Sequence, residues 1–142
     1  MASLMVTDFA DTHHYAAILN HPFYSQEGGD MSADLQICNH HLYELKKGLR
    51  DMVLVTIPRV HSERFCARLD QKDIRYFVQD VSDRKVNIFF GRSECITIVE
   101  SFGVKHLHEL TPEQDFILGI MLGYNSINQY ERFLQRKNAR EK

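Results

Sequence analysis

The sequence predicts an α+β protein: a small three-stranded mixed sheet with a βαββ core, and about five helices. Three short segments, residues 52–57, 74–78 and 86–90, are either mostly apolar or alternate apolar with polar residues, as strands do. An amphipathic helix separates the first two segments, so these two strands should run parallel through a crossover connection. Only a short turn separates the second from the third, so that pair should be antiparallel.

The first expected helix and strand each carry a local pattern. In residues 39–50, leucines recur at helical spacing, Asn39 is placed to cap the first turn, and Gly48 can end the helix. Residues 52–57 are almost continuously apolar and are closed by Pro58. This pattern indicates a short strand buried on both faces.

The middle of the chain alternates between helix and strand patterns. Residues 62–71 place Phe65 and Leu69 on one face and charged residues on the other, which favours an amphipathic helix. Residues 74–78 should form a strand with one buried face, because apolar residues alternate with polar ones: Ile74, Tyr76 and Val78.

Three more helices are expected towards the C-terminus. Ser93 can cap a helix over residues 93–102. Residues 112–122 and 126–137 should form the last two. The first of this pair begins with a capping threonine, a proline at the first helical position and a glutamine three residues after the cap: Thr111, Pro112 and Gln114.

Composition restricts the class of protein. The 142 residues are 44% apolar and 25% charged, as in a globular domain, and the net charge is −2. Because basic residues do not exceed acidic ones, neither a nucleic-acid partner nor a membrane surface is expected. The most apolar stretch, residues 116–124, is shorter than the roughly 20 residues that cross a bilayer. Three widely spaced cysteines and the absence of a signal peptide favour the cytoplasm.

The chain divides near residue 34. Residues 1–34 contain a short helical pattern broken at Pro22 and a polar, glycine-containing run at residues 26–30, so we expect an N-terminal arm that is partly helical or flexible. Residues 35–142 should form a single α+β domain.

The densest cluster of chemically versatile side chains lies in the first expected helix: His40, His41, Tyr43, Glu44, Lys47 and Arg50. These residues could be a solvated helix face in which Glu44 and Lys47 pair. They could instead form a surface for a partner or an anionic ligand, or an enzyme site, with Arg132 contributed by the last helix. No pair of residues can be assigned as nucleophile and base, and no catalytic residue is identified.

Two further features could carry chemistry. Cys95 is a candidate reactive thiol because the first turn of a helix favours a thiolate, although it could simply be a buried core residue. The junction at residues 90–93 links a strand to a helix start, where backbone amides can hold a phosphate or carboxylate; a helix cap is the simpler function.

Glycine spacing marks the next-to-last helix. Gly119 and Gly123 are four residues apart and precede Tyr124. Gly123 could act only as the helix stop, whereas Gly119, inside the helix, indicates a close contact within the fold or across a dimer.

A metal site is not expected. Adjacent histidines such as His40 and His41 diverge by about 100° on a helix and cannot easily share one ion. His106 and His108 could converge in an extended segment, but two ligands are too few. We expect no cofactor either.

Several segments resemble, in order, a small bacterial family of uncharacterised proteins. They span residues 38–134 and include HHLYE with KGLR, VNIFFG with EC, and LTPEQDFILG. The resemblance implies three strands with about five helices, a homodimer, and an association with flavodoxins. Where that family carries a cysteine and an aspartate in and before the last helix, this chain has Tyr130 and Asn125.

The expected function is therefore a non-enzymatic interaction or regulatory module, acting as a homodimer formed partly by the C-terminal helices. A flavodoxin-like redox protein is the expected partner. The alternative is a small-ligand-binding protein or an enzyme that uses His40, Tyr43, Glu44 and Lys47.

Overall fold

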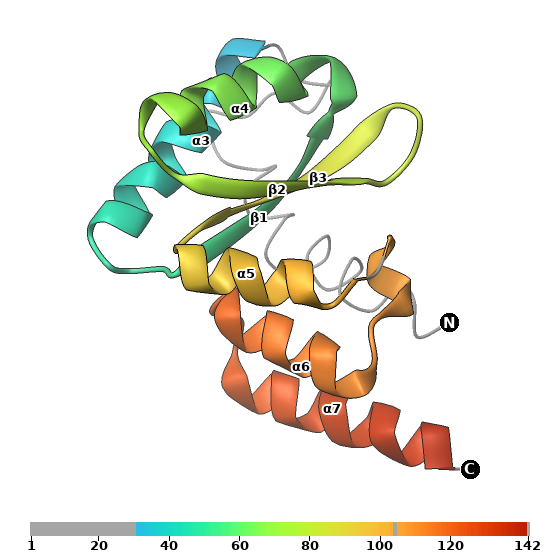
Figure 1. Ribbon diagram of the computed structural model, residues 1–142. Helices are drawn as coiled ribbons and strands as arrows, with labels where there is room; N and C mark the ends of the chain where they lie inside the picture. Colours follow the sequence, from blue (N-terminus) through green and yellow to red (C-terminus); the bar gives the residue numbers. More distant parts are fainter. Residues whose placement is uncertain (1–30, 104, 142) are drawn as a thin grey trace.

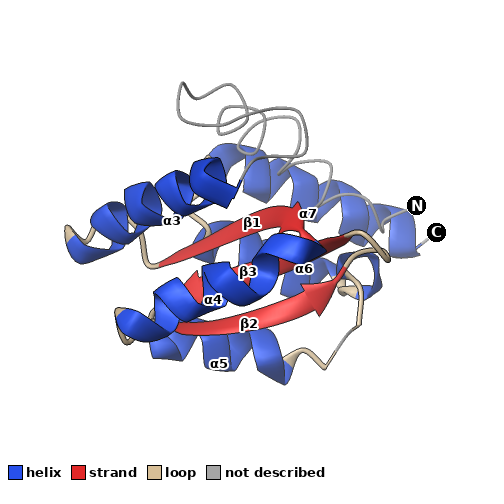
Figure 2. Ribbon diagram, turned by 90° about the horizontal axis from the view of Figure 1, so that it is seen from above, coloured by secondary structure: helices blue, strands red, loops and turns tan. Residues whose placement is uncertain are grey.

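The computed structural model describes residues 31–103 and 105–141, arranged in layers around one sheet (Figures 1 and 2). The helices α3 (Met31–Lys46) and α4 (Ser62–Gln71) cover one face of the sheet. The other face is covered by α5 (Ser93–Ser101) and α6 (Pro112–Met121), and α7 (Ser126–Glu141) packs on α6 at the outside. These five helices and three strands, in the described part of the chain, confirm the predicted α+β class.

The strands β1 (Met52–Pro58), β2 (Arg75–Asp80) and β3 (Lys85–Gly91) form a sheet in the order β1-β3-β2. Both neighbouring pairs are antiparallel, so the sheet is antiparallel and not mixed as predicted. The reason is that β3 lies between the other two, and β1 and β2 share a direction without touching. Six of the seven β3 residues are buried, which suits a central strand. Strand β2 lies at an edge and lacks the predicted alternation, because Val78 is 38% exposed and Gln79 is buried.

Helix α3 begins earlier and ends sooner than the sequence predicted. It runs through residue 39, so Asn39 is not its cap; the Asn39 side chain instead accepts a hydrogen bond from Arg68 of α4 at 2.9 Å. The domain boundary expected between residues 34 and 35 lies inside this helix, where Asp34 is buried and hydrogen-bonded to His61. The rest of the predicted arm, residues 1–30, lies outside the described residues.

Two helices end in the same way. Gly48 after α3 and Gly123 after α6 have φ angles of 75° and 77°, a region that glycine enters without steric cost. In each case the next amide donates to a carbonyl five residues back, at 3.0 Å after α3 and 3.2 Å after α6. The predicted role of both glycines as helix stops is confirmed.

The predicted start of α6 is also confirmed, and that of α5 is corrected. Thr111 and Gln114 form a reciprocal capping box with Pro112 at the first helical position. At α5 the N-cap residue is Arg92, which makes no side-chain cap, and Ser93 is already helical.

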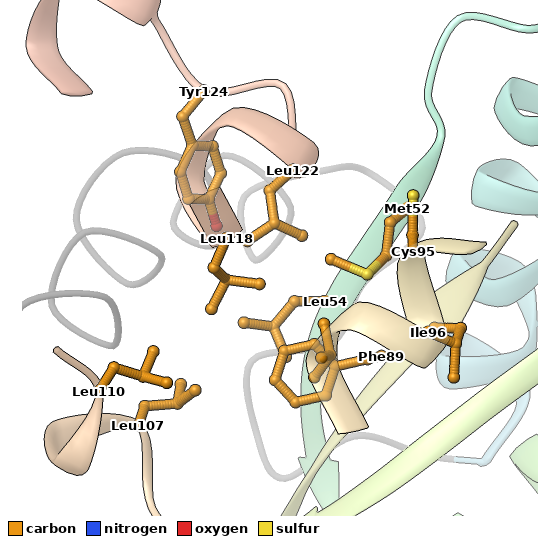
Figure 3. Close-up of a cluster of buried hydrophobic side chains, with 11 residues drawn as sticks. Met52, Leu54, Phe89, Cys95, Ile96, Leu107, Leu110, Leu118, Leu122 and Tyr124 are labelled. Carbon is orange, nitrogen blue, oxygen red and sulfur yellow. The ribbon is translucent and has the colours of Figure 1, made fainter. Parts of the chain in front are cut away.

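The sheet separates two apolar clusters. Alternate residues of β1 and β3 point to opposite faces, so Met52, Leu54 and Phe89 pack against α5 and α6, as Figure 3 shows. Their neighbours Val53, Val55, Ile88 and Phe90 pack against α3 and α4. Strand β1 is therefore buried on both faces, as predicted.

One row of polar side chains crosses all three strands. Thr56, Asn87 and Gln79 are opposite one another in the register. The Thr56 hydroxyl donates to Asn87 Oδ1 at 2.6 Å, and Asn87 Nδ2 donates to Gln79 Oε1 at 3.2 Å. Asn87 and Gln79 are buried, so the row satisfies polar groups inside the protein.

Candidate functional site

The predicted cluster on α3 converges partly on one carboxylate. Glu44 Oε1 lies 2.7 Å from His41 Nδ1 and 3.6 Å from His40 Nε2, and Glu44 Oε2 lies 3.3 Å from Arg50 Nε. His41 is 2% exposed and its ring packs edge-on against Phe90 of the sheet. The cluster is thus anchored on the core side of the helix.

Burial decides the protonation state of His41. Loss of solvent lowers the pKa of His41 from 6.5 to about 4, although the hydrogen bond to Glu44 opposes this shift. Burial raises the pKa of Glu44, but the His41 hydrogen bond and the charge of Arg50 outweigh it and the pKa is lowered. At neutral pH an uncharged His41 therefore donates a hydrogen bond to an ionised Glu44, and the cation of Arg50 offsets the charge of Glu44.

The remaining predicted site residues lie elsewhere. Tyr43 on α3 and Lys47 just after it are exposed, with the Lys47 ammonium 5.6 Å from the centre of the Tyr43 ring. Arg132 lies on α7, in the layer on the opposite side of the sheet. The structure therefore divides the predicted surface into three separate groups.

Arg132 belongs to a polar seam between α6 and α7 that sequence reasoning missed. Asp115, 1% exposed, accepts two hydrogen bonds from Arg132, at 2.9 and 3.2 Å, and lies 3.3 Å from Arg136 Nη1. Arg136 also donates to the Leu110 carbonyl at 3.1 Å. The two arginines are four residues apart, which places both on one face of α7. This spacing is the sequence signal that could have predicted the seam.

The opposite face of α7 is apolar and exposed. Ile127, Tyr130 and Leu134 recur at helical spacing, and their exposed fractions are 63%, 51% and 57%. Neither core cluster includes a residue of α7. Amphipathic helices normally bury the apolar side and expose the polar side, so α7 has the reverse arrangement.

Helix α6 continues this apolar face. Ile117 and Ile120 are 40% and 41% exposed. Between the helices lies a groove of about 400 Å³ lined almost entirely by hydrophobic side chains, with Glu113 at its rim: Phe116, Ile117, Tyr130, Phe133 and Leu134. We call these residues, with Ile120 and Ile127, the α6–α7 face.

The close contact predicted at Gly119 is found within the chain, between α6 and α7. A Cβ atom at Gly119 would lie 2.0 Å from Gln129 Oε1, so the absence of a side chain lets α7 approach α6. Gly123 has open space around it and serves as the helix stop. Tyr124, 9% exposed, packs into the core beside Leu118 and Leu122 (Figure 3).

Cys95 does not have the environment of a reactive thiol. It is buried in the first turn of α5 beside Met52. Burial raises the pKa of Cys95, and the nearby carboxylates of Asp51 and Glu94 add to the effect, while Arg92 only partly opposes it. Of the two roles that the sequence left open for Cys95, its surroundings support that of a buried core residue.

Within residues 31–103 and 105–141, no three histidine, cysteine or acidic side chains come together as metal ligands would. His106 and His108 stack with their ring centres 5.2 Å apart instead of converging on a point. Over the same ranges, every helix is too short or too polar to span a bilayer.

The described residues form a small α+β fold, a three-stranded antiparallel sheet with helices on both faces. Its C-terminal helical pair exposes apolar side chains. A family model described as "Protein of unknown function (DUF2023)" matches residues 36–136, and the chain belongs to this family. The resemblance seen in the sequence is confirmed over nearly the same range. The comparison with curated proteins found no match.

The two departures from the expected family pattern fall at the α6–α7 pair. Asn125 Oδ1 accepts a hydrogen bond from the Asn128 amide at 3.1 Å, which caps the start of α7. An aspartate can do the same, so asparagine there keeps the structural function. Tyr130, at the position where the resemblance leads us to expect a cysteine, is part of the α6–α7 face and adds apolar area there.

Proposed function

We propose that this protein is a non-enzymatic interaction or regulatory module of the bacterial cytoplasm, which acts as a homodimer through the α6–α7 face. The supporting observation is the reversed amphipathicity of α7: polar residues pack against α6, while Ile127, Tyr130 and Leu134 remain exposed. A helix that leaves its apolar side uncovered gains stability only when another surface covers that side.

A second copy of the chain is the occupant that best fits this face. Two antiparallel helices with a shared apolar side can pack on an identical pair around a two-fold axis. At the rim, Lys137 and Glu113 carry opposite charges 2.5 Å apart, so the edge has no excess charge to repel its copy. The homodimer implied by the family resemblance agrees with this arrangement.

The placement of the α3 cluster supports a role other than catalysis. His41 and Glu44 satisfy each other, and Tyr43 and Lys47 point to a different surface. An enzyme site built on this cluster would need these side chains to line one cavity. A flavodoxin-like redox partner remains a prediction from the family resemblance.

Sedimentation equilibrium of the full chain tests the homodimer. The wild-type protein should have twice the 16.6 kDa chain mass. Leu134→Glu should dissociate it, because a buried unpaired carboxylate opposes association; we expect the dimer dissociation constant to rise at least about 100-fold.

A matched control uses the same change at an exposed apolar residue far from this face. Val60, 81% exposed, precedes α4 on the other side of the sheet, and Val60→Glu should leave the dimer intact. A monomeric wild-type protein, or a Leu134→Glu variant as dimeric as the control, would refute the proposal. Turnover of a substrate that is lost in Glu44→Ala would refute the non-enzymatic assignment.

A further inference from the structure

A pocket of about 590 Å³ lies between the C-terminal half of α3, helix α4 and the junction of β3 with α5. Its volume is in the range of sites that hold small organic ligands. No residue of α6 or α7 lines it, so a dimer formed through the α6–α7 face leaves it open.

The lining of this pocket carries positive charge, in a chain whose net charge is −2. Lys46, Arg68, Lys72 and Arg92 line it, and no acidic residue is among its described lining residues. Electrostatic attraction from four cations that share one concavity favours a ligand with more than one negative charge.

These cations are only partly neutralised by the protein. Arg68 is oriented by neutral oxygens, of Asn39 at 2.9 Å and Gln71 at 3.2 Å, which hold the guanidinium without cancelling its charge. Lys46 and Lys72 make no ion pair within the part of the chain that the structure describes. Arg92 pairs with Glu94 at 3.1 Å on the exposed side, and an incoming anion would compete with that carboxylate.

Apart from Asn39, the rest of the described lining is mainly apolar. Leu42, Leu45 and Ile74 line the pocket together with Tyr43, whose ring can stack on a flat group. Gly91 forms part of the floor, where a Cβ atom would lie 2.3 Å from the Asp51 carbonyl oxygen, so the backbone is held close to β1. A cationic rim over an apolar wall fits a ligand with one anionic end and one apolar or aromatic end.

We propose that this pocket binds a small phosphate monoester that carries an aromatic or apolar group, of the size of a nucleoside monophosphate. A phosphate dianion can accept hydrogen bonds from Arg68 and the lysines at once, whereas a carboxylate offers one charge. Tyr43 and the aliphatic residues receive the organic part.

Titration calorimetry and amide NMR of the full chain test this assignment with adenosine monophosphate and phenyl phosphate as probes. At least one ester should bind, and the amide signals of Tyr43, Ile74 and Gly91 should shift. Benzoate, adenosine and inorganic phosphate should each bind at least about tenfold more weakly, since each lacks one of the two recognised features.

The double variant Lys46→Gln with Lys72→Gln should weaken ester binding at least about tenfold, because it removes two charged contacts from exposed positions that the fold does not need. Lys85→Gln, an exposed lysine on β3 outside the pocket lining, should change nothing. Absence of binding by both esters, equal affinity for inorganic phosphate, or equal loss in Lys85→Gln would overturn the proposal. None of these results depends on the oligomeric state.

Discussion

Replacing His41 with asparagine should remove a pH dependence from folding stability. The folded pKa of His41 is about 4, against an ordinary value of 6.5. Between these values the unfolded chain binds a proton that the folded protein excludes, so acidification favours unfolding. This contribution is complete above pH 6.5 and is lost as the pH falls towards 4. The loss is about 2 kcal/mol at pH 5 and about 3 kcal/mol once the pH is well below 4.

Urea denaturation at pH 7.5 and pH 5.0 measures the effect as the change in the free energy of unfolding. The wild-type protein should lose about 2 kcal/mol more than His41→Asn over this interval. Asparagine keeps an N–H donor near the Nδ1 position and cannot titrate, so the variant is less stable at pH 7.5 but its stability varies less with pH. His108→Gln, at an exposed histidine, should retain the wild-type dependence. An equal loss in His41→Asn and wild type would show that His41 is not held neutral by burial.

Two further predictions concern stability and thiol reactivity. Gly119→Ala should destabilise the fold by about 1–3 kcal/mol in urea denaturation, because displacement of the buried Gln129 side chain outweighs the better helix propensity of alanine. Adding Gln129→Ala should recover part of the loss. An unchanged free energy of unfolding in Gly119→Ala alone would contradict the contact. Iodoacetamide at pH 7.5 should label Cys95 more slowly than free cysteine. The half-buried Cys66 should be labelled first, although burial raises the pKa of Cys66 to about 11. Mass spectrometry of the labelled peptides measures this order, and labelling of Cys95 before Cys66 would contradict it.

Local patterns predicted most elements but not the order of the strands. Phe65 with Leu69, the Thr111 cap and Gly123 are short-range signals, and each produced the expected helix or helix end. The strand order depends on which strand can be buried on both faces. The segment at residues 86–90 is apolar except for Asn87, which is the pattern of a strand buried on both faces, whereas the short connection between β2 and β3 does not show where β1 joins the sheet.

The candidate sites show a similar division. Sequence spacing correctly brought Glu44 near His40, but it could not show that His41 is buried. The basic pocket combines residues from α3, α4 and the β3–α5 junction, and no local pattern links Lys46 to Arg92. Contacts between distant segments depend on tertiary packing, which spacing along one helix does not describe.

The polar row of Thr56, Asn87 and Gln79 has a consequence for how the sheet reaches a single pairing. A shift of β1 by two residues along β3 would keep every apolar side chain on its proper face, so hydrophobic patterning cannot discriminate against it. That shift would separate Thr56 from Asn87 and take the Thr56 hydrogen bond away from Asn87 Oδ1, at a cost of about 1–3 kcal/mol if this buried oxygen stays unsatisfied. The polar row thus favours one register of β1 on β3. Asn87 of the central strand provides this preference, which the neighbouring apolar side chains do not.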